Sequence, residues 1–123
     1  EAAARKTLER GIQGNENDAS LWFSLALLEV REGNADLALQ SLAKAAALEE
    51  TPGYYHYVYA VAQHDQGRPA EALATLRATH RAAPGQPNVL AALVQYSQQI
   101  GDEQAAERYR NELRNTAQAA GLQ

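Results

Sequence analysis

The clue to the architecture is a short segment that recurs along the chain, Gly67-Arg68-Pro69-Ala70-Glu71-Ala72. Its glycine has counterparts at Gly33 and Gly101, each 34 residues away, and its last alanine has counterparts in the same register at Ala4, Ala38 and Ala106. Glycine is scarce in this sequence, so three glycines at one spacing are informative. A fixed period of this length predicts a row of equivalent structural units that stack on one another.

Each unit is expected to hold two amphipathic helices, one on either side of the glycine. Apolar residues fall at helical spacing in both halves of the first full unit, at Leu21, Leu25 and Leu28 and then at Leu39, Leu42 and Leu48. A helix commonly ends with a left-handed residue, and glycine adopts that conformation without steric cost. Pro69 then suits the first turn of the next helix, and Asp102 can cap another.

These signals predict an all-α chain with seven helices and no strands. The expected helices cover residues 2–13, 19–32, 35–48, 53–66, 69–82, 87–99 and 102–119. Breaks between units are expected at Thr51-Pro52 and at Pro84-Gly85-Gln86-Pro87. The recurring alanines should lie where the second helix of a unit crosses the first.

Composition excludes several classes of function. With 11 basic and 15 acidic residues, the chain has no general attraction for nucleic acid or an anionic membrane surface. The absence of cysteine excludes disulfides and cysteine metal sites. No apolar run approaches the roughly 20 residues of a bilayer-spanning helix, so direct membrane insertion is not expected. We treat residues 1–123 as a single domain and, because the sequence lacks an initiator methionine, as a fragment of a longer protein.

The period and the residue pattern resemble the tetratricopeptide repeat family over essentially the whole chain. The family's aromatic, leucine and small positions are occupied in the first full unit by Trp22, Leu25, Ala26, Ala38 and Ala45, and in the second by His56, Tyr59, Ala60, Ala72 and Thr79, followed by Pro84. The third unit departs from the pattern at Val94 and Arg110. The resemblance implies a right-handed α-solenoid of about three and a half repeats. Residues 1–18 would be the second helix of a truncated repeat, followed by full repeats at 19–52, 53–86 and 87–120.

A second likeness concerns localisation, which is otherwise unknown. The tyrosine-rich run 54–62 resembles the repeats appended to certain bacterial multihaem cytochromes that are exported to the periplasm. This likeness favours a bacterial protein and a periplasmic over a cytoplasmic location. The segment contains no haem-attachment motif, so no cofactor is expected.

No arrangement of residues indicates an enzyme. His56, His64 and His80 lack the spacing of metal ligands, and no serine lies in a nucleophile elbow. The acidic pairs Glu49-Glu50 and Asp102-Glu103 fall at turns, where capping is the simpler role. We therefore expect a non-catalytic protein without a metal site.

The family resemblance implies that the first helix of each unit lines a concave groove. Its candidate residues are Phe23, Leu27, Val30, Arg31, Tyr54, Tyr57, Val61, His64, Gln95 and Gln98. Such an apolar and aromatic surface predicts that the partner is a protein or peptide, with an apolar or amphipathic segment in the groove. Family members that hold acidic chaperone C-termini use lysine, asparagine and arginine in the groove. The matching positions in this chain are Phe23, Leu27, Val58, Asn88 and Ala92, so that clamp is absent.

Two alternatives stay open. The aromatic residues could serve only to pack neighbouring units, and the chain could be an assembly element or accessory domain that packs against its parent chain or a second copy, for instance in a bacterial redox protein. The N-terminal helix is expected to pack inward through Ala4, Leu8 and Ile12. It would leave an uncovered flank of small residues at Ala3, Thr7 and Gly11. An uncovered repeat predicts self-association through this helix.

Overall fold

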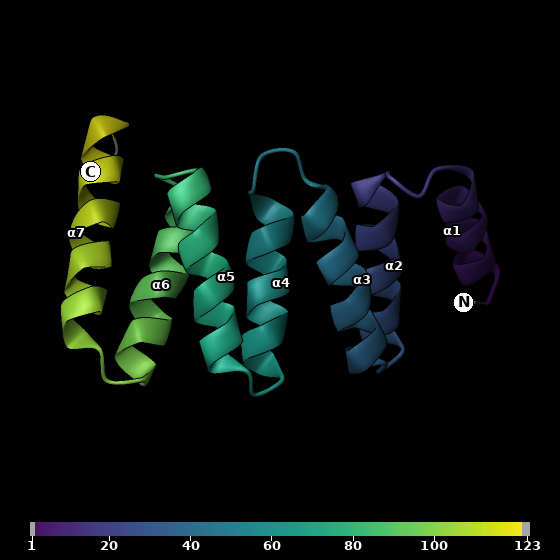
Figure 1. Ribbon diagram of the computed structural model, residues 1–123, viewed down its shortest axis with the longest axis horizontal. Helices are drawn as coiled ribbons and strands as arrows, with labels where there is room; N and C mark the ends of the chain where they lie inside the picture. Colours follow the sequence, from purple (N-terminus) through teal and green to yellow (C-terminus); the bar gives the residue numbers. More distant parts are fainter. Residues whose placement is uncertain (1, 122–123) are drawn as a thin grey trace.

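The computed structural model describes residues 2–121, and this range contains seven α-helices and no strand. The helices are α1 (Ala2–Gly14), α2 (Ala19–Arg31), α3 (Ala35–Leu48), α4 (Tyr54–Asp65), α5 (Pro69–Ala82), α6 (Pro87–Gln99) and α7 (Glu103–Ala119). Their ends agree with the expected ends to within one residue. Figure 1 shows the helices side by side in chain order, with the two termini at opposite ends of the row.

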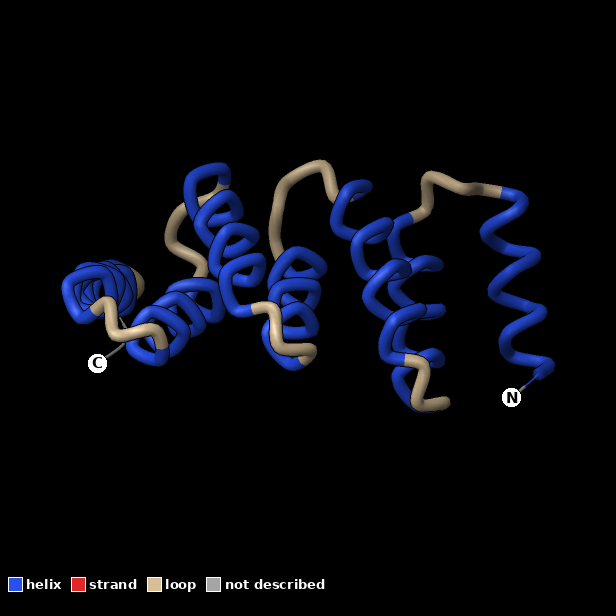
Figure 2. Tube along the Cα trace, turned by 60° about the horizontal axis from the view of Figure 1, so that its bottom comes forward, coloured by secondary structure: helices blue, strands red, loops and turns tan. Residues whose placement is uncertain are grey.

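The architecture is a right-handed α-solenoid of antiparallel helix hairpins of the tetratricopeptide type, as expected. The most extensive contacts join α2 with α3, α4 with α5, and α6 with α7. Connections alternate between the two edges of the row, which Figure 2 shows in tan. The first helices α2, α4 and α6 therefore run in the same direction. Aromatic contacts join α2 to α4 and α4 to α6, and we call the side that these three helices form the first-helix face.

The turn inside each hairpin has one conserved geometry because it has one glycine. Gly33, Gly67 and Gly101 have φ values of 78°, 77° and 82°, in the left-handed region that side chains disfavour. The following residue then donates its N–H to a carbonyl five positions earlier, for example Asn34 to Glu29 at 2.8 Å, which closes the helix end. Pro69 begins α5, and the Asp102 carboxylate accepts the Ala105 N–H at 3.1 Å, so both expected helix starts are confirmed.

The buried core runs along the row rather than forming one centre. Ala38, Ala72 and Ala106 are each at most 2% exposed, as expected of small residues at helix crossings, whereas their counterpart Ala4 is half-buried. One buried cluster joins α4, α5 and α6 through Ala60, Ala72, Leu73, Leu76, Val89, Ala92, Leu93 and Tyr96.

Inside the hairpins, a buried polar pair repeats in the same register. The Ser41 hydroxyl donates to the Glu29 carboxylate at 2.6 Å, and the Thr75 hydroxyl donates to the Gln63 carbonyl oxygen at 2.7 Å. The equivalent of Glu29 and Gln63 in the third hairpin is Ser97, which is fully buried and whose hydroxyl has no partner in the described part of the chain. The polar pair therefore weakens along the array.

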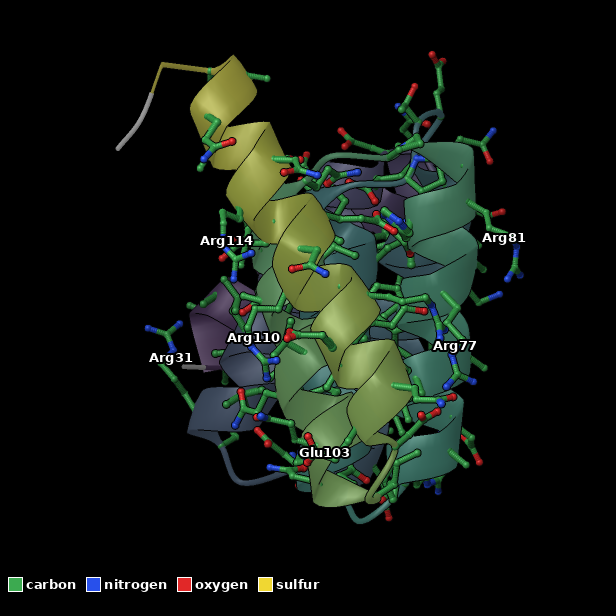
Figure 3. The ribbon with its side chains drawn as sticks, turned by 90° about the vertical axis from the view of Figure 1, so that its left-hand side faces the viewer. Arg31, Arg77, Arg81, Glu103, Arg110 and Arg114 are labelled. Atoms are coloured by element: carbon green, nitrogen blue, oxygen red, sulfur yellow. The ribbon has the colours of Figure 1, made fainter. Side chains whose placement is uncertain are left out.

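The two ends of the row differ in polarity. In α7, Glu107 and Arg110 occupy the register positions that Leu73 and Leu76 hold in α5, and they pair with each other at 2.8 Å. The departure from the repeat pattern at Arg110 thus falls on the last helix of the described residues, where it forms this ion pair. Figure 3 looks along the row from this end, with α7 nearest the viewer.

Candidate functional site

Exposed apolar side chains gather on the first-helix face. Residues 2–121 expose five large hydrophobic side chains, and three of them, Leu27, Val30 and Tyr54, belong to α2 and α4 at 47%, 59% and 58% exposure. Phe23 connects them, because its ring lies 5.9 Å from the ring of Tyr54 and one helical turn before Leu27. We call these four residues the apolar strip.

Beside this strip lies a cavity of 540 Å³, lined by Leu8 of α1 and by Ser24, Leu27, Val30 and Arg31 of α2. We call it the edge cavity. Arg31 is the only charged residue in its lining and makes no ion pair within residues 2–121. Figure 3 shows Arg31 reaching outward on the side opposite Arg77 and Arg81.

Several of the expected groove residues are used for packing between units. Phe23 stacks on Tyr55 at 4.6 Å, Tyr54 lies 6.3 Å from Tyr57, and Tyr57 is partly buried against the core cluster. Val61 is also half-buried. Tyr55, Tyr57 and Val61 are therefore partly buried by packing, whereas Tyr54 stays exposed.

His64 faces the next unit. Its ring stacks on Tyr96 of α6, with centroids 3.9 Å apart and planes 4° apart, and its Nε2 lies 2.5 Å from the Gln99 side-chain oxygen. Nδ1 lies 3.9 Å from Asp65. Burial raises the pKa of Tyr96, and the charge of Asp65 adds to that effect. The remaining expected residues, Gln95 and Gln98, are exposed on α6.

The contact between α2 and α4 that is equivalent to the His64–Tyr96 stack is less well packed. Val30 and Ala62 occupy, between α2 and α4, the register positions of His64 and Tyr96, and a cavity of 240 Å³ remains there. Smaller side chains thus leave space between the first two units that an aromatic stack fills between the next two.

An ion pair that sequence reasoning missed fastens α1 to α2. Arg5 lies 2.6 Å from Glu32 and 3.7 Å from Glu29, and Glu29 is only 4% exposed. The hydrogen bond to Glu32 raises the pKa of Arg5. A signal was available, because Glu29, Gln63 and Ser97 share one register position and all are polar.

The expected arrangement of α1 was partly wrong. Ile12 is buried as expected, but Gly11 faces α2, where an added Cβ would lie 3.2 Å from Leu21, and it is not part of an open flank. Ala4 and Leu8 are only half-buried. Ala3 and Thr7 are exposed, as expected, and the half-buried side chain of Leu8 borders the edge cavity.

At the start of α4, one carboxylate serves several donors. Glu49 accepts the backbone N–H groups of Gly53, Tyr55 and His56 at 3.0–3.2 Å and lies 2.6 Å from the His56 Nδ1. Burial alone would raise the pKa of Glu49, but the His56 bond and the three backbone bonds outweigh it and lower that pKa. Glu49 of the acidic pair at this turn therefore caps α4, as expected, whereas Glu50 is exposed.

Within residues 2–121, no three His, Asp or Glu side chains are grouped closely enough to hold a metal ion. None of the helices in this range is long and apolar enough to cross a lipid bilayer.

Solved structures of MamA share this arrangement of helices. One MamA crystal structure superposes with a TM-score of 0.79 at 15% sequence identity, covering 95% of this chain and 64% of that one. A MamA structure labelled MSR-1 gives 0.73 at 22% identity over 94% and 67%, and a D159K mutant gives 0.70 at 21% over 91% and 65%. The fold is similar to that of MamA.

At these identities the likeness to MamA shows a shared helical-repeat fold. The chain spans about two thirds of the length of these MamA chains. Neither a protein-family model nor a curated protein matches the sequence. The expected likeness to multihaem cytochrome repeats has no support in the MamA matches.

Proposed function

We propose that this chain is a non-catalytic protein-interaction scaffold whose first-helix face binds an apolar or amphipathic peptide or helix. The observation that carries the proposal is the apolar strip, in which Leu27, Val30 and Tyr54 remain exposed beside a cavity. Contiguous apolar surface of this kind is uncommon on a folded protein unless a partner covers it. Covering it contributes roughly 25 cal/mol per Å² of apolar area removed from water.

The candidate residues take different parts in this proposal. Phe23, Leu27, Val30 and Tyr54 supply the apolar contact. Beneath them, Tyr57, Val61 and His64 hold the first helices of neighbouring units together. Polar groups at the margins, Arg31, Gln95 and Gln98, orient the bound segment.

A peptide-display selection against the 123-residue chain tests this proposal. Selected peptides should bind Tyr54→Ala more weakly than the parent by about 1–3 kcal/mol, because a rigid exposed ring buries much area at low entropic cost. Leu37→Ala is the control, since Leu37 is 45% exposed on α3, outside the strip. Peptides that bind the Tyr54 variant as tightly as the parent would contradict the proposal.

A second candidate is an assembly role in which α1 and the edge cavity pack against a second copy or against the parent chain. The cavity lined by Leu8, Leu27 and Val30 favours this candidate, since a repeat surface without its neighbour promotes association. The assembly role predicts that sedimentation of the chain alone depends on its concentration.

A further inference from the structure

The edge cavity is a place in the array that a helix occupies everywhere else. Leu42 and Leu76 share a register position and are 2% and 0% exposed, because the first helix of their own hairpin covers them. Leu8 holds the same position in α1 but is only half-buried and lines the edge cavity. No helix within residues 2–121 lies over it.

The repeat register shows how a helix would fit there. An incoming helix would take the place of a first helix. It would pack on α1 in the way that α2 packs on α3. It would also lie beside α2 in the way that α4 lies beside α6. At the α4–α6 contact, His64 meets Tyr96 and Gln99. The register positions of Tyr96 and Gln99 are held in α2 by Leu28 and Arg31. The residue of the incoming helix that corresponds to His64 would therefore meet Arg31.

We propose that the edge cavity accepts an amphipathic helix of a partner protein, which runs parallel to α2 and sets a carboxylate near its C-terminal end against Arg31. The apolar side of this helix covers Leu8, Leu27 and Val30. This inference deepens the proposed function and rests on it. Charge complementarity carries the choice of partner, because Arg31 is the only charge in an otherwise uncharged lining and has no ion pair in the described chain.

A second copy of the chain fits this place less well. Two edge cavities that face each other would bring Arg31 towards Arg31, which disfavours the contact. The opposite end of the row presents the polar helix α7, on which Figure 3 shows Arg110 and Arg114. Glu107 pairs with Arg110 there.

A charge-reversal experiment with synthetic helical peptides tests the inference. The probe is a peptide of residues 19–32 with Val30→Glu, because α2 is itself a first helix and Val30 is its counterpart of His64. It carries two added lysines and a fluorescein at its N-terminus. Otherwise identical peptides carry Val30→Gln and Val30→Lys. Fluorescence anisotropy measures their binding to the parent chain and to Arg31→Glu, with folding checked by circular dichroism.

The Glu peptide should bind the parent on the order of fivefold more tightly than the Gln peptide, the size expected for a partly exposed ion pair. Arg31→Glu should reverse the order, so that the Lys peptide binds best. Leu27→Glu should abolish binding of all three peptides, whereas Leu37→Glu should not. Because Arg31, Leu27 and Leu37 are all exposed, these variants should fold.

Equal affinities of the Glu and Gln peptides for the parent, with no reversal in Arg31→Glu, would overturn the inference. The inference would also be overturned if the parent chain is a dimer and Leu27→Glu makes it a monomer. That result would assign the edge cavity to a second copy of the chain. The proposed function fails separately, through display-selected peptides that are indifferent to Tyr54→Ala.

Discussion

At the scale of single residues, Glu49 concentrates more interactions than any helix-capping residue around it. Its carboxylate accepts three backbone N–H groups and lies 2.6 Å from the His56 ring. Because Gly53, before α4, has no side chain to cap that helix, the carboxylate of the preceding turn performs this role. The Glu49 contact therefore fixes how the second full repeat joins the first.

Glu49→Gln should lower the free energy of unfolding by about 1 kcal/mol at neutral pH, the usual size of a capping loss. The folded-state pKa of Glu49 lies below its ordinary value of 4.5. Its contribution is therefore complete above that value and is lost as the pH falls through the folded-state pKa. Denaturant unfolding at several pH values should show that the free energy of unfolding falls less in the variant than in the parent as the pH is lowered towards about 3. If acidification lowers the free energy of unfolding of parent and variant equally, this role of Glu49 is contradicted.

Residue types in the sequence predicted the aromatic surface but not which of its side chains are buried and which are exposed. Tyr54 and Tyr57 are three residues apart on one helix, yet Tyr54 is 58% exposed whereas Tyr57 packs against the core cluster. Which tyrosine is buried depends on the rotation of α4 against α6, the two helices that the His64–Tyr96 stack joins. A register of 34 residues states which positions are equivalent but not how neighbouring units are rotated.

At the scale of helices, the hairpins depend on close crossings at small residues. Ala72 is fully buried where α5 crosses α4. Ala72→Leu should therefore lower the free energy of unfolding by about 1–3 kcal/mol through overpacking. Ala74→Leu on the exposed side of the same helix is the matched control and should change it by less than about 0.5 kcal/mol. Similar losses in both variants, measured by denaturant unfolding, would show that the crossing is loosely packed.

The junction of α1 with α2 is held by charge where later junctions are apolar. Leu39 and Gln63 occupy, one unit later, the positions of Arg5 and Glu29. Because Arg5 is 27% exposed, added salt should screen its ion pairs. Amide hydrogen exchange in α1 should then speed up with salt.

The double variant Arg5→Leu, Glu29→Gln copies the pair of the next unit and should abolish that salt dependence. Exchange in α5 provides the internal reference, because its junction with α6 buries Leu73 and Leu76 and carries no comparable ion pair among the described residues. If exchange in α1 of the parent chain does not change with salt, the electrostatic junction is refuted.

Helix boundaries were the most predictable feature because each has a local cause. The left-handed glycines, Pro69 and Asp102 mark ends that do not depend on distant contacts. By contrast, the Arg5–Glu29 contact joins residues of different units, and its geometry follows only from the stacking of those units. The edge cavity likewise depends on how far α1 stands from α2.

At the scale of the whole molecule, the array is asymmetric. Its C-terminal helix α7 turns charged residues outward, whereas α1 and α2 enclose the edge cavity at the other end. The association that we propose would therefore take place at the N-terminal part of the first-helix face, where the apolar strip also lies. The amide-rich third unit, with Gln95 and Gln98, offers hydrogen bonds but little apolar area.

The most direct test of the proposed scaffold role compares one substitution at two places. Leu27 on α2 and Leu37 on α3 are 47% and 45% exposed, so Leu27→Ala and Leu37→Ala remove the same group from equally exposed sites. Display-selected peptides should bind Leu27→Ala more weakly than the parent, with a loss of about 1–3 kcal/mol in binding free energy. Their binding free energy for Leu37→Ala should stay within about 0.5 kcal/mol of the parent value. Equal affinities of the two variants would contradict binding at the first-helix face.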